Sequence, residues 1–185
     1  MDTVELLKKY QAGIKNFSGI ELVEAILANA DLAQIVFSQA KLPEANFTRA
    51  NLIGANFYFA QLNLSNLSEA ILTEANLKSA SLRSALLYKI SGGKAQFQMA
   101  NLQGAIFKRA FLKEANFVKA NLVSADLSQA NLIDADLTGA NLTGASLDKA
   151  FLQGANLANA DVTGAKLEQA VLTGAIMPDG KLFDR

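Results

Sequence analysis

Residues 130–144 read ANLIDADLTGANLTG, which is one five-residue unit repeated three times. The unit, Ala-x-Leu/Phe-x-x, extends over nearly the whole chain of 185 residues. Every fifth residue from Phe17 to Met177 gives 33 central positions, and 30 of them are Leu or Phe. The positions two residues before a centre, from Ala25 to Ala175, number 31, and 28 of them are Ala. The repeat therefore keeps one phase along the chain.

A period of five fits neither an α-helix nor a flat β-strand. In a helix, five residues advance by about 500°, so an apolar stripe would rotate around the cylinder. In a flat strand, an odd period sends successive Leu residues to opposite faces. The Ala and Leu of one unit lie two residues apart, which puts them on the same side of an extended backbone. A short extended segment followed by a tight corner satisfies these constraints, and its repetition predicts an all-β solenoid with an internal core.

The phenylalanines indicate how many units make one turn. Most of the Phe residues at central positions fall on one column with a spacing of 20 residues, in which Leu77 fills the gap. Side chains of equal size stack in this way if a coil contains four units. We therefore predict a quadrilateral β-helix of about eight four-sided coils. The column contains Phe17, Phe37, Phe57, Phe97 and Phe117, and a second column contains Phe47 and Phe107.

Two residue types suit the corners of such a coil. Asn or Asp often precedes the central residue, as at Asn46 and Asp136, and its side chain can bond to nearby backbone. Gly often lies two residues after the centre, as at Gly54 and Gly139, where it provides backbone freedom for a turn. We interpret both as structural, and neither as a ligand site.

The composition removes most catalytic chemistry. The chain has no Cys and no His, so thiolate nucleophiles and imidazole acid–base catalysis are excluded. A solenoid filled with Ala and Leu also has no concave pocket in which two carboxylates could converge. We predict that the protein is not an enzyme, with no catalytic, cofactor-binding or metal-binding residues and no cofactor.

The two ends of the chain depart from the repeat. Residues 1–14 are predicted to contain a short capping helix over 2–12, in which Val4, Leu7 and Tyr10 cover the first coil. The β-helix is expected over 15–179, and residues 180–185 form a tail. After a turn at 178–180, Leu182 and Phe183 either fold back over the last coil or pack on the end of another molecule.

One pentad, Ile90-Ser91-Gly92-Gly93-Lys94, breaks the pattern because Gly92 replaces a central Leu. The pair of glycines suggests a bulge or a loosened corner. A functional loop is the alternative interpretation. The structural one is preferred because the segment is one pentad long and Phe57 and Phe97 keep their spacing across it.

Two sets of outward side chains are candidates for binding. The first is a modest basic column that Glu69 interrupts, and we interpret it as a solvated edge and not as a nucleic-acid site. It contains Arg49, Glu69, Lys89, Arg109, Gln129 and Lys149, with Lys108 beside it. The second is a possible protein-partner surface of outward apolar residues. It contains Tyr58, Phe59, Met99, Ile71, Phe111 and Phe151.

The units at 130–144 resemble the pentapeptide repeat proteins, and the resemblance spans residues 15–179. It implies a right-handed coil, because nothing in the periodicity sets the hand. It also implies a non-catalytic structural or protein-interaction module of unassigned biological role. The alternative function is a DNA-mimicking protein that binds a topoisomerase and protects gyrase. That mechanism needs a strongly negative rod, whereas this chain has 17 basic and 17 acidic residues.

The expected partners and location follow from the same observations. The start of the chain lacks the pattern of a signal peptide, and no apolar stretch reaches about 18 residues. We expect a cytoplasmic protein with an unidentified protein partner and with no nucleic-acid or membrane binding. Its state is expected to be a monomer or an end-to-end dimer.

Overall fold

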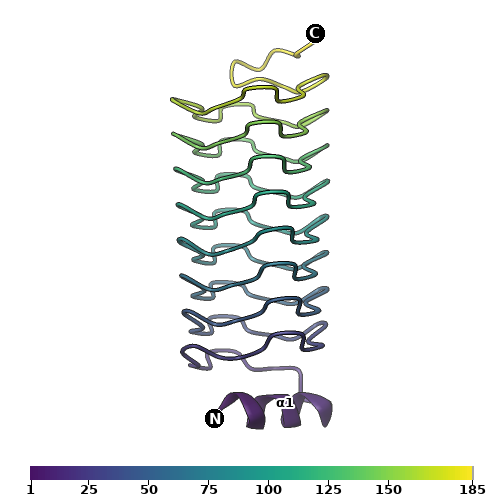
Figure 1. Cartoon of the computed structure of the whole chain (residues 1–185), viewed down its shortest axis with the longest axis vertical. Coiled ribbons are helices and arrows are strands. Elements are labelled where there is room, and N and C mark those ends of the chain that lie inside the picture. Colours follow the sequence, from purple (N-terminus) through teal and green to yellow (C-terminus); the bar gives the residue numbers. More distant parts are fainter. Residues whose placement is uncertain (185) are drawn as a thin grey trace.

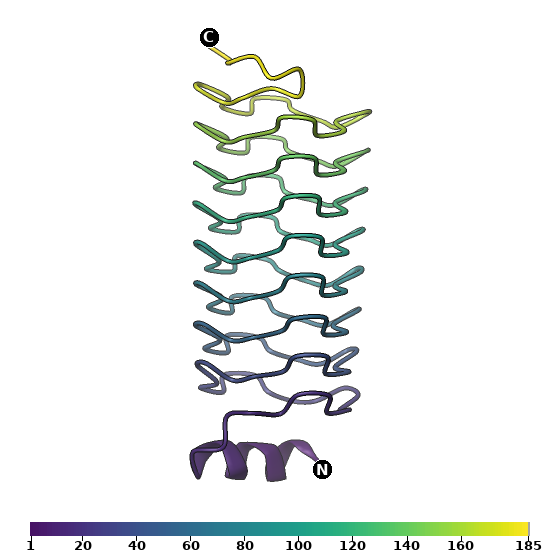
Figure 2. The ribbon, with the colours of Figure 1, turned by 180° about the vertical axis from the view of Figure 1, so that it is seen from behind.

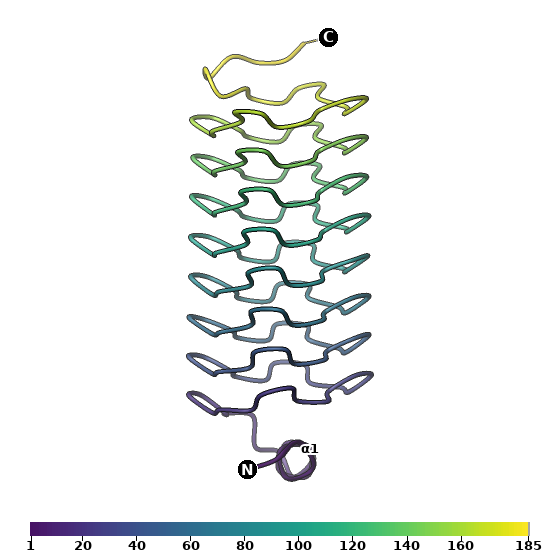
Figure 3. The same ribbon diagram turned by 60° about the vertical axis from the view of Figure 1, so that its left-hand side comes forward.

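The computed structural model describes residues 1–184 as a straight rod, with one helix across its N-terminal end and a short tail at the other end (Figure 1). Single-residue parallel β-bridges connect residues 20 apart, from Asn16↔Val36 to Asn156↔Ile176. One coil therefore contains 20 residues, as the phenylalanine column predicts. Views from behind and from the side show the same regular stack of coils (Figures 2 and 3).

The four pentads of a coil define four faces, which we number in chain order. The central residues of face 1 begin with Phe17, those of face 2 with Leu22, those of face 3 with Leu27 and those of face 4 with Leu32, and each column repeats every 20 residues. The residues directly before and after a centre point outward from its face. The last residue of each pentad lies at the corner that leads to the next face.

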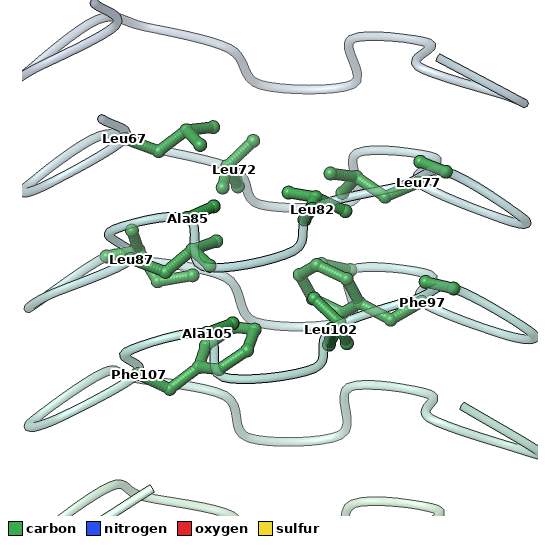
Figure 4. Packing of buried hydrophobic residues seen from close by; sticks show 14 of the residues in the cluster. Leu67, Leu72, Leu77, Leu82, Ala85, Leu87, Phe97, Leu102, Ala105 and Phe107 are labelled. Atoms are coloured by element: carbon green, nitrogen blue, oxygen red, sulfur yellow. The ribbon is translucent and has the colours of Figure 1, made fainter. Parts of the chain in front are cut away.

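The central residues of all four faces fill the interior (Figure 4). The rings of Phe97 and Phe117 on face 1 stack with centroids 4.8 Å apart. Phe107 on face 3 meets Phe97 edge-on, with its centroid 5.7 Å away. Opposite faces therefore touch across the axis, and the rod has a packed core and not a channel.

Backbone hydrogen bonds explain why five residues suffice for one side of the coil. In pentad 50–54, four of the five N–H groups donate to backbone carbonyls: two to the next coil, one to the preceding coil and one within a corner. The fifth, that of Ile53, donates to Oδ1 of Asn51 at 3.2 Å. This Asx bond recurs along the rod, for instance from Val118 N–H to Asn116 Oδ1 at 3.0 Å. The recurring Asn and Asp residues therefore satisfy the one donor that the ladder leaves over.

Both prolines of the chain confirm this account. Pro43 and Pro178 occupy the position directly after a centre, where the backbone N–H has no role in the ladder. The Asx acceptor is also missing in these two pentads, where Lys41 and Ile176 replace it. A fixed φ near −65° suits the second residue of the turn.

The corners are β-turns whose third residue has a positive φ, as in Lys119 at 56° and Gly139 at 64°. The prediction that glycine supplies freedom at this position is confirmed. Non-glycine residues nevertheless occupy 24 of these positions. The left-handed region costs such residues roughly 1–2 kcal/mol each. Parallel pairing of consecutive coils must offset this cost at every corner.

The predicted bulge at Gly92–Gly93 is wrong. Ser91 keeps its bridges to Ile71 and to Phe111, and Gly92 N–H donates to the Phe111 carbonyl at 2.7 Å. Ile90, which replaces an Ala of the unit, is fully buried and fills the space that a central Leu would take. The regular backbone survives because the two substitutions compensate in volume.

Helix α1, Thr3–Gln11, covers the first coil. Asp2 caps it by accepting a hydrogen bond from Glu5 N–H at 2.8 Å. Leu6 is fully buried, whereas Val4 is 76% exposed, so the expectation that Val4 covers the coil is wrong. Two residues turn a helix by about 200°, and the face that holds Leu6 therefore points Val4 to solvent.

At the C-terminal end, residues 181–183 fold back across the last coil after the turn at 178–180, and Leu182 pairs antiparallel with Ile176. Phe183 is partly buried and exchanges backbone hydrogen bonds with Gly174 and Ala175. Leu182 is 62% exposed, so only Phe183 of the two predicted residues covers the core. Val162 and Leu167 stay partly exposed, and their N–H groups have no backbone acceptor within residues 1–184.

Candidate interaction surface

The first group of predicted partner residues lies at the corner between faces 1 and 2. Tyr58, Phe59 and Met99 are 41%, 52% and 66% exposed. The rings of Tyr58 and Phe59 contact each other edge-on, with centroids 4.6 Å apart. Each ring therefore covers part of the other, and this corner is a small apolar cluster.

The second group lies on face 4. Ile71, Phe111 and Phe151 occupy one outward column, in which Ser91 and Asn131 alternate with them. Face 1, with its outward Asn residues, separates this column from Tyr58 and Phe59. The six residues therefore form two surfaces, and the larger one belongs to face 4.

Sequence reasoning missed Ala33, Ile53 and Ile133 of face 4 because it followed one column at a time. Nearly every coil presents one outward apolar side chain on this face, either directly before or directly after the centre. Together these residues form what we call the face 4 stripe. It contains Ala33, Ile53, Ile71, Phe111, Ile133, Phe151 and Val171.

Pairing of consecutive coils also shapes the corner between faces 3 and 4, which is the predicted basic column. Arg49 Nε contacts Glu69 Oε2 at 2.8 Å, and Arg109 Nε donates to Gln129 Oε1 at 2.9 Å. The Arg49 pair holds the pKa of the Glu69 carboxyl below its ordinary value. Lys89 and Lys149 have no ion pair within the described part of the chain. We call Arg49, Lys89, Arg109 and Lys149 the basic edge of face 4.

Two carboxyl groups of face 3 lie next to each other in consecutive coils. Asp148 and Glu168 share a hydrogen bond, which lowers the pKa of Asp148 and raises the pKa of Glu168. Asp148 lines an open, polar depression of about 500 Å³, together with Lys108, Ser146 and Lys166. Residues 1–184 contain no group of three or more metal-ligating acids.

None of the described residues belongs to a helix long and apolar enough to span a bilayer. The chain has a single short helix over the described range, and that helix caps the rod. Its surfaces are therefore those of the four faces and the two ends.

The profile of the family described as Pentapeptide repeats matches eight copies over residues 30–68, 62–87, 95–134 and 135–174. The chain belongs to this family. The match omits 88–94, which includes Gly92, although the coil continues through this pentad. Membership implies that the β-helix of this pentapeptide repeat protein is right-handed.

The solved structures that resemble this pentapeptide repeat protein include HetL and QnrB1. HetL, which is involved in heterocyst differentiation regulation in the cyanobacterium Nostoc sp. strain PCC 7120, is 32% identical. The alignment covers 99% of this chain and 100% of HetL, with a TM-score of 0.63. QnrB1, a plasmid-mediated fluoroquinolone resistance protein, is 22% identical over 89% of this chain and 84% of its own, with a TM-score of 0.80. A search of curated protein sequences finds no significant match.

Proposed function

We propose that this pentapeptide repeat protein is a non-catalytic module that binds another protein through the side of its rod. The observation that carries the proposal is the face 4 stripe. Phe111 is 59% exposed at a position where other pentads carry an Asx residue that stabilises the corner. Folding gains little from an exposed ring in place of that hydrogen bond, and exposed apolar patches mark contact sites.

The shape of the molecule supports the same proposal. Residues of one outward column recur at the strand spacing, roughly 4.7–4.9 Å, on a rigid stack. A partner therefore meets side chains at fixed positions without an ordering cost on this side of the interface. The likeness to HetL supports a regulatory context for such binding, because HetL is described as acting in the regulation of differentiation.

Photo-crosslinking in the native cell tests the proposal. A photoreactive phenylalanine replaces, one at a time, Val118, Val123, Ser128 and Ile133, which lie on faces 1, 2, 3 and 4 of one coil. We expect a discrete covalent adduct with another protein from one of the faces, and no adduct from the opposite one. The absence of any adduct from all four faces, with each variant folded, would contradict an interaction role.

The second function, gyrase protection by DNA mimicry, has less support. The likeness to QnrB1 at 22% identity concerns the fold alone. A DNA-like rod needs an excess of negative charge, whereas this chain is neutral and carries cations on the basic edge. Relief of quinolone inhibition in a gyrase supercoiling assay would promote this alternative above the first.

A further inference from the structure

The C-terminal end of the rod leaves part of the core uncovered. On faces 2 and 3 of the last coil, Val162, Leu167 and Ala170 are only partly buried. The equivalent residues of the preceding coil are fully buried, and they are Leu142, Leu147 and Ala150. The tail lies over the other side of the last coil, where Phe183 N–H donates to the Ala175 carbonyl at 2.7 Å (Figure 1). Faces 2 and 3 therefore end in an apolar step beside the tail.

The same two faces leave the hydrogen-bond ladder unpaired. In the preceding coil, the N–H groups of Leu142 and Gly144 donate to the last coil at 2.7 and 2.9 Å, and the Ala145 carbonyl accepts from it at 2.9 Å. The equivalent groups of the last coil have no partner within residues 1–184. They comprise four N–H groups, of Val162, Gly164, Leu167 and Gln169, and two carbonyls, of Ala165 and Ala170.

This excess of donors is built into every side of the coil. Toward the N-terminal end, face 2 of the last coil accepts through two carbonyls, of Asp161 and Thr163, at 2.7 and 2.9 Å. It donates in that direction through one N–H, that of Asp161, at 2.9 Å. The C-terminal edge of a coil is thus rich in partial positive charge and the N-terminal edge in partial negative charge. The electrostatic complement of the open end is an extended backbone that offers two carbonyls for each N–H.

Outward side chains of consecutive coils also pair by charge. Lys41 contacts Glu21 at 3.1 Å in the column directly before the centres of face 2. In the last coil, Asp161 occupies this column and Lys166 occupies the equivalent column of face 3. Neither has an ion pair in the part of the chain that the structure describes. A segment added to this end would therefore meet a negative charge on face 2 and a positive charge on face 3.

We propose that the C-terminal end of the rod binds an extended segment of a partner protein, which adds to faces 2 and 3 as a further stretch of coil, parallel to residues 161–170. The segment carries two apolar residues five positions apart, with a basic residue directly before the first and an acidic residue directly before the second. Backbone pairing would give the affinity of such strand addition, and the side chains its specificity. This site is separate from the face 4 stripe and does not depend on the function proposed above.

The hydrogen-bond polarity disfavours a second copy of the chain as the occupant. Head-to-tail stacking would place the open end on the N-terminal end of the next rod, which α1 covers through the fully buried Leu6. Two C-terminal ends that face each other would offer eight N–H groups and four carbonyls on these faces, twice the four and two of one end. N–H groups would then oppose N–H groups without an acceptor.

A displayed peptide library tests the proposal. The probe is a phage-displayed library of random 15-residue peptides, selected against the full-length protein. We expect the enriched peptides to share two apolar residues five positions apart, preceded by Lys or Arg at the first and by Asp or Glu at the second. In the presence of an enriched peptide, amide hydrogen exchange measured by NMR should slow at least tenfold at the four unpaired N–H groups.

Substitutions at the open end test the register. Val162→Lys places a charge on the apolar step and should weaken binding of the enriched peptides at least tenfold. Lys166→Glu reverses an exposed charge, and a selection repeated against this variant should enrich Lys or Arg before the second apolar residue. Arg83→Glu reverses an exposed charge on face 2 in the middle of the rod and should leave binding unchanged. Thermal unfolding of Lys166→Glu should match the wild type, so the exchange of preference reports binding and not folding.

Four results would each overturn the proposal. These are no enrichment above an unrelated control protein, enriched peptides without the five-residue spacing, unchanged exchange at 161–170, and the same acidic preference against Lys166→Glu. A dimer in solution that Val162→Lys dissociates would assign the end to self-association instead. Peptide binding that Phe111→Ser abolishes would place the contact on face 4. A partner crosslinked to the side of the rod would leave the proposed function standing in each case.

Discussion

The side chain of Ile90 occupies the space that a leucine at Gly92 would fill. A Cβ on Gly92 would lie 3.3 Å from Cδ1 of Ile90 and 3.1 Å from Cδ2 of Leu112. Both distances are tighter than ordinary packing. A residue that is too large for its position thus pairs with one that is too small, and the coil keeps its register.

This relationship predicts strong coupling between the two positions. Gly92→Leu alone should overpack the core and cost about 1–3 kcal/mol of unfolding free energy. Ile90→Ala alone should leave a cavity and cost about 2–5 kcal/mol. The double variant restores the consensus unit and should unfold near the wild-type denaturant midpoint. Simple addition of the two single losses would contradict the compensation.

The corner conformation gives a second prediction, on residues of one column. Gly139 has a φ of 64° and room for a Cβ, so Gly139→Ala should cost about 1 kcal/mol through backbone strain alone. Lys119→Gly, at a φ of 56°, should stabilise the protein by up to about 1 kcal/mol. Gly93→Ala is the control without a positive φ and should not destabilise. Equal midpoints for Gly139→Ala and wild type would contradict the assigned turn.

The Asx bond gives a third prediction. Asn116→Ala leaves the N–H of Val118 without its acceptor and should cost about 1 kcal/mol. Val118→Pro removes that donor, as Pro43 does in its own pentad. In the Val118→Pro background, Asn116→Ala should therefore cost close to nothing. Equal losses in both backgrounds, measured by urea unfolding, would show that Asn116 acts in another way.

Much of the fold could be predicted because the repeat itself encodes it. The period of five, the inward Ala and Leu columns and the Phe spacing together determine a 20-residue coil. The short helix at the N-terminus was also predicted, although its bounds, Thr3–Gln11, differ from the expected 2–12 by one residue at each end. These features depend on spacing along the chain, which sequence displays directly.

Other features depend on contacts between side chains and could not be predicted. Gly92 looks like a bulge until the volume of Ile90 is placed beside it. Val4 and Leu6 both fit an amphipathic helix, and only docking on the first coil selects Leu6. The face 4 stripe alternates between two columns, so it is visible only when consecutive coils are aligned.

Stacked carboxyls on face 3 give a prediction about pH. The shared hydrogen bond raises the pKa of Glu168 above 4.5, so its contribution to stability is present at low pH and is lost as pH rises through the raised pKa. The pKa of Asp148 is lowered, so its contribution is lost as pH falls through the lowered pKa. Glu168→Gln removes the titration at position 168. Its Tm at pH 7 should be no lower than that of wild type, and the difference should shrink toward pH 4.

The control for this prediction is the Asp148→Asn background, in which Glu168→Gln should change Tm equally at all pH values between 4 and 7. In the wild-type background, the change in Tm caused by Glu168→Gln should be small because both carboxyl groups are exposed. A Tm of the Glu168→Gln variant that falls at pH 7 and recovers at pH 4 would contradict the shared hydrogen bond.

Disulfide crosslinking tests the central claim, that four pentads make one turn, most directly. The chain has no cysteine, so an engineered pair reports one distance without background. Thr138→Cys with Ala158→Cys places two thiols in one outward column of consecutive coils, at about 4.8 Å between backbones, which allows a disulfide. Thr138→Cys with Gln153→Cys, 15 residues apart, places them on different faces. The account predicts rapid, complete oxidation of the first pair and none of the second, and the reverse result would contradict it.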